Sequence, residues 1–104
     1  MKQYKRQILD AVKYFIEDQI NYWKESWNTK EDVENDLENA KDWFWEEINE
    51  NFDEFKEILD ISEEITDKEI KNYIEKISNE VDEIIELSCG DAEKYYYDFD
   101  QEDW

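Results

Sequence analysis

The clearest indication of the fold is in residues 31–60, which read EDVENDLENA KDWFWEEINE NFDEFKEILD. Apolar side chains recur there every three or four residues, which is the period of one face of an α-helix. These are Val33, Leu37, Ala40, Phe44, Ile48, Phe52, Phe55 and Leu59. Acidic side chains follow the same period at an offset of about 200°, which places them on the opposite face. These are Glu31, Glu34, Glu38, Asp42, Glu46, Glu50, Asp53, Glu57 and Asp60. The segment is predicted to be one long amphipathic helix with a straight line of carboxylates.

The acidic face contains more like charge than helix stability favours. Residues 31–60 hold 13 acids and two lysines, Lys41 and Lys56. A lysine four residues from a glutamate stabilises a helix by about 0.2–0.5 kcal/mol, and a like-charge pair costs a similar amount. We therefore interpret this face as a binding surface, which Glu47 and Glu54 widen.

Three consecutive aromatic residues, Trp43, Phe44 and Trp45, lie within the same segment. Neighbours in a helix are about 100° apart, so the three cannot all enter one narrow core stripe. Two arrangements remain open. Both tryptophans lie at the edges of a wide buried face, or one of them borders the acidic face and anchors an interface.

Two further helices are predicted around this segment. The first helix is predicted over residues 2–27, the second over 30–60 and the third over 67–88. Capping boxes at Thr29 and Thr66 mark the starts of the second and third helices. Gly90 is predicted to adopt a left-handed conformation and to end the third helix. Short connections predict an all-α, antiparallel three-helix bundle in a single domain of residues 1–90. Residues 91–104 form an acidic aromatic tail, which either packs as one more helical turn or remains a mobile interaction arm.

The overall charge restricts the partners that the chain can bind. The net charge of the 104 residues is −20, with +2 in residues 1–30 and −22 in residues 31–104. A mean hydropathy of −1.10 is typical of disorder, but aromatic residues make up 16% of the chain and fall at helical spacing, which favours an ordered fold. Such a surface repels nucleic acid and anionic membranes and attracts basic proteins. The expected partner is a basic nucleic-acid-binding protein.

The residue types argue against catalysis and against a bound cofactor or metal. The chain has no histidine and one glycine, so it lacks the commonest general base, imidazole metal ligands and a phosphate-binding loop. Asp98, Asp100, Glu102 and Asp103 lack the glycine and final glutamate of a calcium loop. Cys89, the single cysteine, is expected to be a small apolar residue at a helix end. With no apolar run for a signal peptide or a membrane span, the predicted location is the cytoplasm of a bacterial host cell.

The linear charge density suggests what the acidic face imitates. Thirteen acids over about 44 Å of helix give roughly one charge per 3.4 Å, the density of one DNA strand. In composition and spacing, residues 31–104 resemble the small acidic DNA-mimic proteins of phages and mobile elements, namely Ocr-type antirestriction proteins and anti-CRISPR proteins. The resemblance implies an inhibitor that occupies the basic nucleic-acid channel of a CRISPR effector or restriction enzyme. The predicted contact residues are Glu31, Glu34, Glu38, Asp42, Glu46, Glu47, Glu50, Asp53, Glu54, Glu57, Trp43 and Trp45.

Two other functions are compatible with the same sequence. A small acidic helical protein could be an immunity protein or antitoxin that neutralises one cognate basic toxin. It could instead be an assembly protein that forms a homodimer or larger oligomer through exposed tryptophan and tyrosine side chains. A mimic differs from both because excess duplex DNA should displace it from its target.

Overall fold

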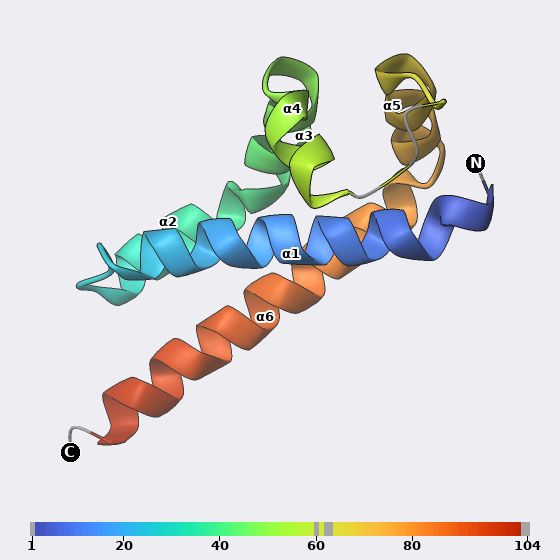
Figure 1. Ribbon diagram of the computed structural model, residues 1–104. Helices are drawn as coiled ribbons and strands as arrows, with labels where there is room; N and C mark the ends of the chain where they lie inside the picture. Colours follow the sequence, from blue (N-terminus) through green and yellow to red (C-terminus); the bar gives the residue numbers. More distant parts are fainter. Residues whose placement is uncertain (1, 60, 62–63, 103–104) are drawn as a thin grey trace.

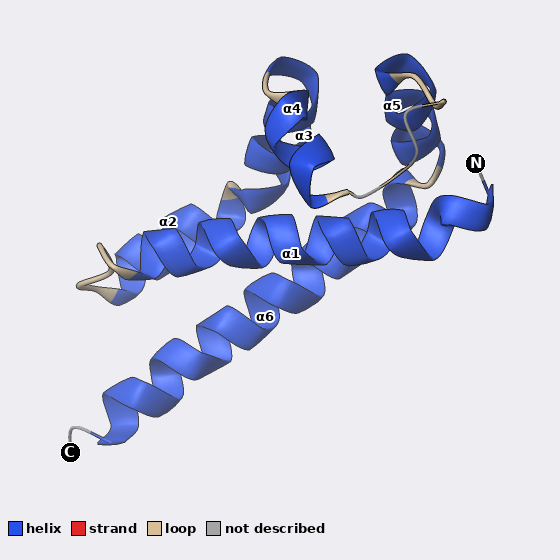
Figure 2. Ribbon diagram, viewed as in Figure 1, coloured by secondary structure: helices blue, strands red, loops and turns tan. Residues whose placement is uncertain are grey.

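The computed structural model describes residues 2–59, 61 and 64–102, with side chains described for residues 3–59, 61 and 64–94. Within these ranges the regular structure is entirely helical, and the all-α prediction is confirmed (Figure 2). The elements are a short 3₁₀ helix η1 (Lys2–Tyr4) and the α-helices α1 (Lys5–Lys24), α2 (Lys30–Glu38), α3 (Ala40–Glu50), α4 (Phe52–Ile58), α5 (Asp67–Lys76) and α6 (Ser78–Glu102).

The two longest helices, α1 and α6, cross each other, and each of the other four α-helices packs against at least one of them (Figure 1). α2 lies along the C-terminal half of α1, whereas α3, α4 and α5 lie on one side of α1. The C-terminal part of α6 diverges from α1, and the molecule measures 54 × 23 × 20 Å along its principal axes. The fold is therefore elongated, with its core where α1, α3, α4 and α6 meet.

The apolar faces of the helices form this core. Ile8, Val12, Phe15, Ile16 and Ile20 of α1 are buried, and Trp23 and Trp27 pack against them with partial exposure. Phe15 is central, because its ring stacks on Trp43 at a centroid distance of 5.1 Å and meets Phe55 edge-on at 5.6 Å. Large aromatic surfaces account for much of the apolar area that such a small domain can bury.

The prediction of one continuous helix over residues 30–60 is wrong. Helical regularity is interrupted at Asn39 and again at Asn51, so that the segment forms α2, α3 and α4. Asn39 donates its side-chain amide to the Asn35 carbonyl at 2.8 Å, and Asn51 donates its own to the Glu47 carboxylate at 3.0 Å. The Asn39 side chain in this way competes for a backbone carbonyl of the helix, whereas the Asn51 bond joins two side chains. The chain can change direction twice without glycine or proline.

The third predicted helix, residues 67–88, also differs from the structure. It is interrupted at Ile77, and α6 then continues through Gly90 to Glu102. Gly90 has no positive φ, so its predicted role as a left-handed helix terminator is wrong. The expected tail is thus helical in its backbone up to residue 102, whereas the packing of its aromatic side chains, and residues 103–104, lie outside the described residues.

The helices predicted to begin after Thr29 and Thr66 do begin there, as α2 and α5. The Thr29 hydroxyl accepts a hydrogen bond from the Asp32 amide at 3.2 Å, and the Asp32 carboxylate accepts one from the Thr29 amide at 3.2 Å, which completes a capping box. The Thr66 hydroxyl accepts from the Glu69 amide at 3.2 Å. Each cap satisfies an amide that the first helical turn leaves without a partner.

Replacing Gly90 with alanine should raise the free energy of unfolding by about 0.5–1 kcal/mol, because alanine restricts the unfolded chain and favours the helix. A Cβ added at Gly90 has no heavy atom of another part of the molecule within 4 Å, so no clash opposes the gain. Thermal unfolding followed by circular dichroism measures the change. A loss of stability would instead indicate the left-handed terminator that the sequence suggested.

Candidate functional site

The acids predicted to contact a partner lie on three helices. They are Glu31, Glu34 and Glu38 on α2, Asp42, Glu46, Glu47 and Glu50 on α3, and Asp53, Glu54 and Glu57 on α4. Glu47 is partly buried and the other nine are exposed. Asp60, the last member of the predicted line, lies outside the described residues. The acidic residues therefore do face solvent, as the helical period predicted.

The arrangement of these acids in space differs from the predicted straight line. α2 lies beside α1, whereas α3 and α4 point away from it and run next to each other (Figure 1). The three helices have nine, eleven and seven residues, so each extends over about 10–17 Å in place of one 44 Å rod. The charge density along each helix is preserved, but its match to one straight DNA strand is lost.

The two lysines of the acidic segment form ion pairs with other parts of the fold. Lys41 pairs with Glu86 of α6, and Lys56 pairs with Asp67 of α5 at 2.8 Å. The hydrogen bond with Glu86 is the main cause of the raised pKa of Lys41. These pairs connect α3 and α4 to the C-terminal helices. Their positive charges are therefore directed at least in part to Glu86 and Asp67, which are not predicted contact acids.

Two acids of residues 31–60 that fall outside the predicted line have internal roles. Asp32 caps α2, and backbone hydrogen bonds from Asn28 and Thr29 lower its pKa. Asp36 accepts a hydrogen bond from the Trp27 indole at 2.6 Å, which joins the end of the first helical segment to α2. The described acids of the predicted line thus face solvent, whereas Asp32 and Asp36 accept hydrogen bonds within the fold.

Trp43 and Trp45 lie at the edges of the buried face. Trp43 stacks on Phe15 and meets Trp23 edge-on at 5.8 Å. Trp45 meets Phe44 edge-on at 5.4 Å and donates its indole N–H to Asp82 of α6 at 3.0 Å. Both side chains are partly buried against the core, so the first of the two arrangements left open by the sequence is the one observed. Any contact with a partner would use only their exposed edges.

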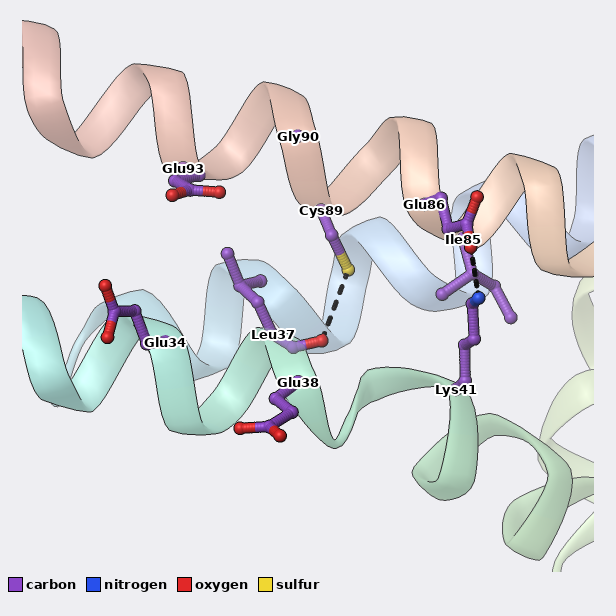
Figure 3. A pocket seen from close by; sticks show the side chains of 9 residues that line it. All are labelled: Glu34, Leu37, Glu38, Lys41, Ile85, Glu86, Cys89, Gly90 and Glu93. Carbon is purple, nitrogen blue, oxygen red and sulfur yellow. Dashed lines mark hydrogen bonds and ion pairs between the residues drawn. The ribbon is translucent and has the colours of Figure 1, made fainter.

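A groove between α2 and α6 brings further acids opposite the predicted ones (Figure 3). This α2–α6 groove has a volume of about 420 Å³ and is lined by Glu34, Leu37, Glu38, Lys41, Ile85, Glu86, Cys89, Gly90 and Glu93. Glu34 extends from α2 toward α6, and Glu93 extends from α6 toward α2. One carboxylate from each helix, Glu34 and Glu93, therefore flanks a depression with an apolar floor, whereas the Glu38 carboxylate is directed away from α6 (Figure 3).

Glu86 and Glu93 are candidate contact residues that were not among those predicted from the sequence. They are seven residues apart, which puts both near the same face of α6, and this spacing can be recognised in the sequence. However, the sequence predicted that the helix ends at Gly90, between them, and it gave no means of deciding which face of α6 packs beside α2. Their position opposite α2 comes from the tertiary structure.

Cys89 is partly buried in the floor of the groove, and its thiol lies 3.8 Å from the Leu37 carbonyl, to which it donates a weak hydrogen bond. Burial raises the pKa of Cys89 to about 11, although the nearby Lys41 opposes the shift. A raised pKa keeps the thiol protonated at neutral pH, and the thiolate is the reactive form. Cys89 is therefore an unreactive apolar residue in the middle of α6, not at a helix end as predicted.

At pH 8, the thiolate fraction of Cys89 should be about a hundredfold below that of a thiol with the ordinary pKa of 9.0. Alkylation by iodoacetamide should be slower by a similar factor in the folded protein than in concentrated guanidinium. Because the folded pKa is raised, the rate should continue to increase with pH up to about 11. A plateau near pH 9 in the folded protein would contradict the assignment.

Together, the fold and this surface define a small all-helical acidic protein in which each of the six described α-helices presents carboxylates to solvent. Within the described ranges, no three acidic or cysteine side chains are arranged to hold a metal ion, and no helix has the apolar run that a membrane span requires. Comparison with protein-family models, curated proteins and solved structures finds no match.

Proposed function

We propose that this protein is a DNA-mimic inhibitor, which binds the basic nucleic-acid channel of a defence protein, a CRISPR effector or a restriction enzyme, and thereby excludes DNA. The observation that carries the proposal is the exposure of nine of the ten predicted contact acids on α2, α3 and α4. A partner with lysine and arginine side chains placed for phosphates would pair with these carboxylates. Inhibition of this kind needs neither catalysis nor a cofactor.

The proposal does not require the straight 44 Å line. DNA-binding channels are lined by basic side chains on several walls, so a bent acidic surface can meet more of them than a rod can. The carboxylates of α2 and α6 on either side of the α2–α6 groove add to this negative charge. Lys41 pairs with one of these residues, Glu86, and leaves the net charge of the groove lining negative.

The charge also sets how the complex should form. A net charge of −20 steers a basic partner toward the acidic surface at long range, and dissolved salt screens this attraction. Association should therefore become slower as ionic strength rises. The same charge disfavours direct binding to nucleic acid and to anionic membranes.

Competition with labelled duplex DNA tests the proposal. The purified protein would be titrated into complexes of the duplex with a CRISPR effector nuclease, a type I restriction enzyme and an unrelated basic nuclease, and fluorescence anisotropy would report DNA release. We expect release from at least one of these proteins, reversed by excess unlabelled duplex. Binding to a basic protein without DNA release would instead favour the immunity-protein function, and no effect on any of them would contradict the proposal.

Self-association through aromatic side chains has less support. The described tryptophans are all partly buried against the core, and the exposed aromatic side chains that remain in the described part are those of Tyr14 and Tyr22, at 66% and 70% exposure. Single exposed apolar residues are usual on monomeric proteins. Trp104 lies outside the described residues.

A further inference from the structure

We propose that the α2–α6 groove binds one arginine side chain of the basic partner, with the stem on the apolar floor and the guanidinium between the carboxylates of α2 and α6. The inference rests on the proposed function in one respect, namely that the partner is a basic protein. It goes further because it names one position on the surface and one residue type that occupies it.

The floor of the groove suits the stem of a long side chain. Leu37 projects from α2 into the groove, and Cys89 faces it from α6 (Figure 3). Ile85 lies deeper and is fully buried. Arginine side chains lay their methylene groups along apolar surface while the charged end stays among polar groups. An occupant with both an apolar stem and a charged end fits this groove better than a small cation does.

The carboxylates supply the complementary charge. Four glutamates and one lysine line the groove, and Lys41 is already paired with Glu86 at one end of it. Glu93, which extends from α6 toward α2, forms no ion pair with any residue whose side chain the structure describes. Glu34 lies 3.9 Å from Lys30, and both of these side chains are more than half exposed, so water screens that pair. A cation entering between α2 and α6 therefore meets carboxylates that are still available.

Arginine fits this arrangement better than lysine does. The guanidinium group is planar, carries five N–H donors and can hydrogen-bond two carboxylates at once, here one from each helix. It is also more weakly hydrated than an ammonium group, so less solvation is lost when it enters a partly apolar groove. Lysine would satisfy the charge but fewer of the acceptors.

Peptide titration tests the groove without the natural partner. Two acetylated and amidated pentapeptides, Ala-Ala-Arg-Ala-Ala and its lysine counterpart, would be titrated into the ¹⁵N-labelled protein at low salt. We expect saturable amide shifts centred on Leu37, Cys89 and Gly90, with the arginine peptide binding at least about threefold more tightly. Shifts spread evenly over all acidic helices, or equal binding of the two peptides, would overturn the inference.

Amino-acid substitutions distinguish binding in the groove from general attraction to the negative charge of the protein. Glu34→Gln combined with Glu93→Gln should weaken arginine-peptide binding by at least about fivefold, whereas Asp10→Asn with Asp18→Asn, on exposed positions of α1, should change it less than twofold. Gly90→Leu alters no charge but adds a side chain at the groove lining, where a Cβ meets nothing within 4 Å. It should weaken binding of the same peptide while circular dichroism confirms an intact fold.

The DNA-release assay distinguishes failure of the groove from failure of the proposed function. If the wild-type protein releases DNA from a target and the Glu34→Gln, Glu93→Gln variant does so with equal affinity, the proposed function stands and the groove is not the arginine site. If the wild-type protein releases no DNA from any target, the proposed function fails. A groove-specific arginine titration would then still support arginine binding by the protein itself.

Discussion

Reversal of three central charges, Glu38→Lys, Asp42→Lys and Glu46→Lys, is expected to reduce affinity for the basic target on the order of 10²–10⁴-fold. Each reversal removes one attraction and adds one repulsion, about 1–2 kcal/mol per position at a protein surface, and the three effects add along the interface. All three residues are exposed, so no buried contact is lost. Anisotropy of the DNA-release reaction or calorimetry with the target measures the change.

The fold should tolerate these reversals. The three lysines would repel one another as the three acids now do, but each would attract the remaining carboxylates of α2 and α3. The one local cost is at Asp42, because an acidic residue in the first turn of α3 interacts favourably with the helix dipole. Helicity and melting temperature should therefore remain close to those of the wild-type protein.

A matched control keeps the same net charge. Asp10→Lys, Asp18→Lys and Glu25→Lys change three exposed acids of the first helical segment and its end, and raise the net charge from −20 by the same six units. If only total charge mattered, this variant would lose as much affinity as the first. We expect a loss smaller by at least about tenfold, and equal losses would show that the contact surface is not on α2 and α3.

Replacement of Phe44 with alanine is expected to lower the free energy of unfolding by about 3–5 kcal/mol. The Phe44 side chain is fully buried, and its ring meets Phe15 and Phe55 edge-on, each at 6.0 Å. Truncation removes this contact between α3, α1 and α4 and leaves a cavity. In a domain of this size the melting temperature should fall by on the order of 15–30 °C, which thermal unfolding measures.

The exposed residue Ile58 provides the comparison. Its side chain is 39% exposed at the end of α4, so Ile58→Ala should cost less than about 1 kcal/mol. A similarly small loss for Phe44→Ala would contradict the central position of α3 in the core. Well below its melting temperature, the Phe44→Ala protein should bind the basic target normally, because no exposed carboxylate has changed.

The helical period predicted most of the core and the outward direction of the acids. Seven of the eight apolar residues expected on the face of residues 31–60 are buried, and the remaining one, Leu37, lies partly exposed in the groove floor. Burial of one face follows from spacing alone, because any helix that packs at all must cover its apolar stripe. Ala92 was missed because the third helix was expected to end before it.

The helix interruptions at Asn39 and Asn51 were harder to predict for a physical reason. Asparagine is a modest helix breaker, and sequence position does not reveal whether its side chain will point to solvent or bond to the preceding turn. The choice depends on whether the core is better filled by a bent segment. The interruption at Asn51 lies between Phe44 and Phe55, and both rings contact Phe15.

The period of 3.6 residues along the chain specifies that this protein is helical, specifies most of its buried residues and directs the carboxylates outward. The shape of the acidic surface, in contrast, follows from tertiary packing. The direction of α3 and α4, the continuation of α6 through Gly90 and the pairing of α2 with α6 all depend on packing between residues far apart in sequence. Such packing places Glu34 opposite Glu93 across a groove, and no local pattern specifies it.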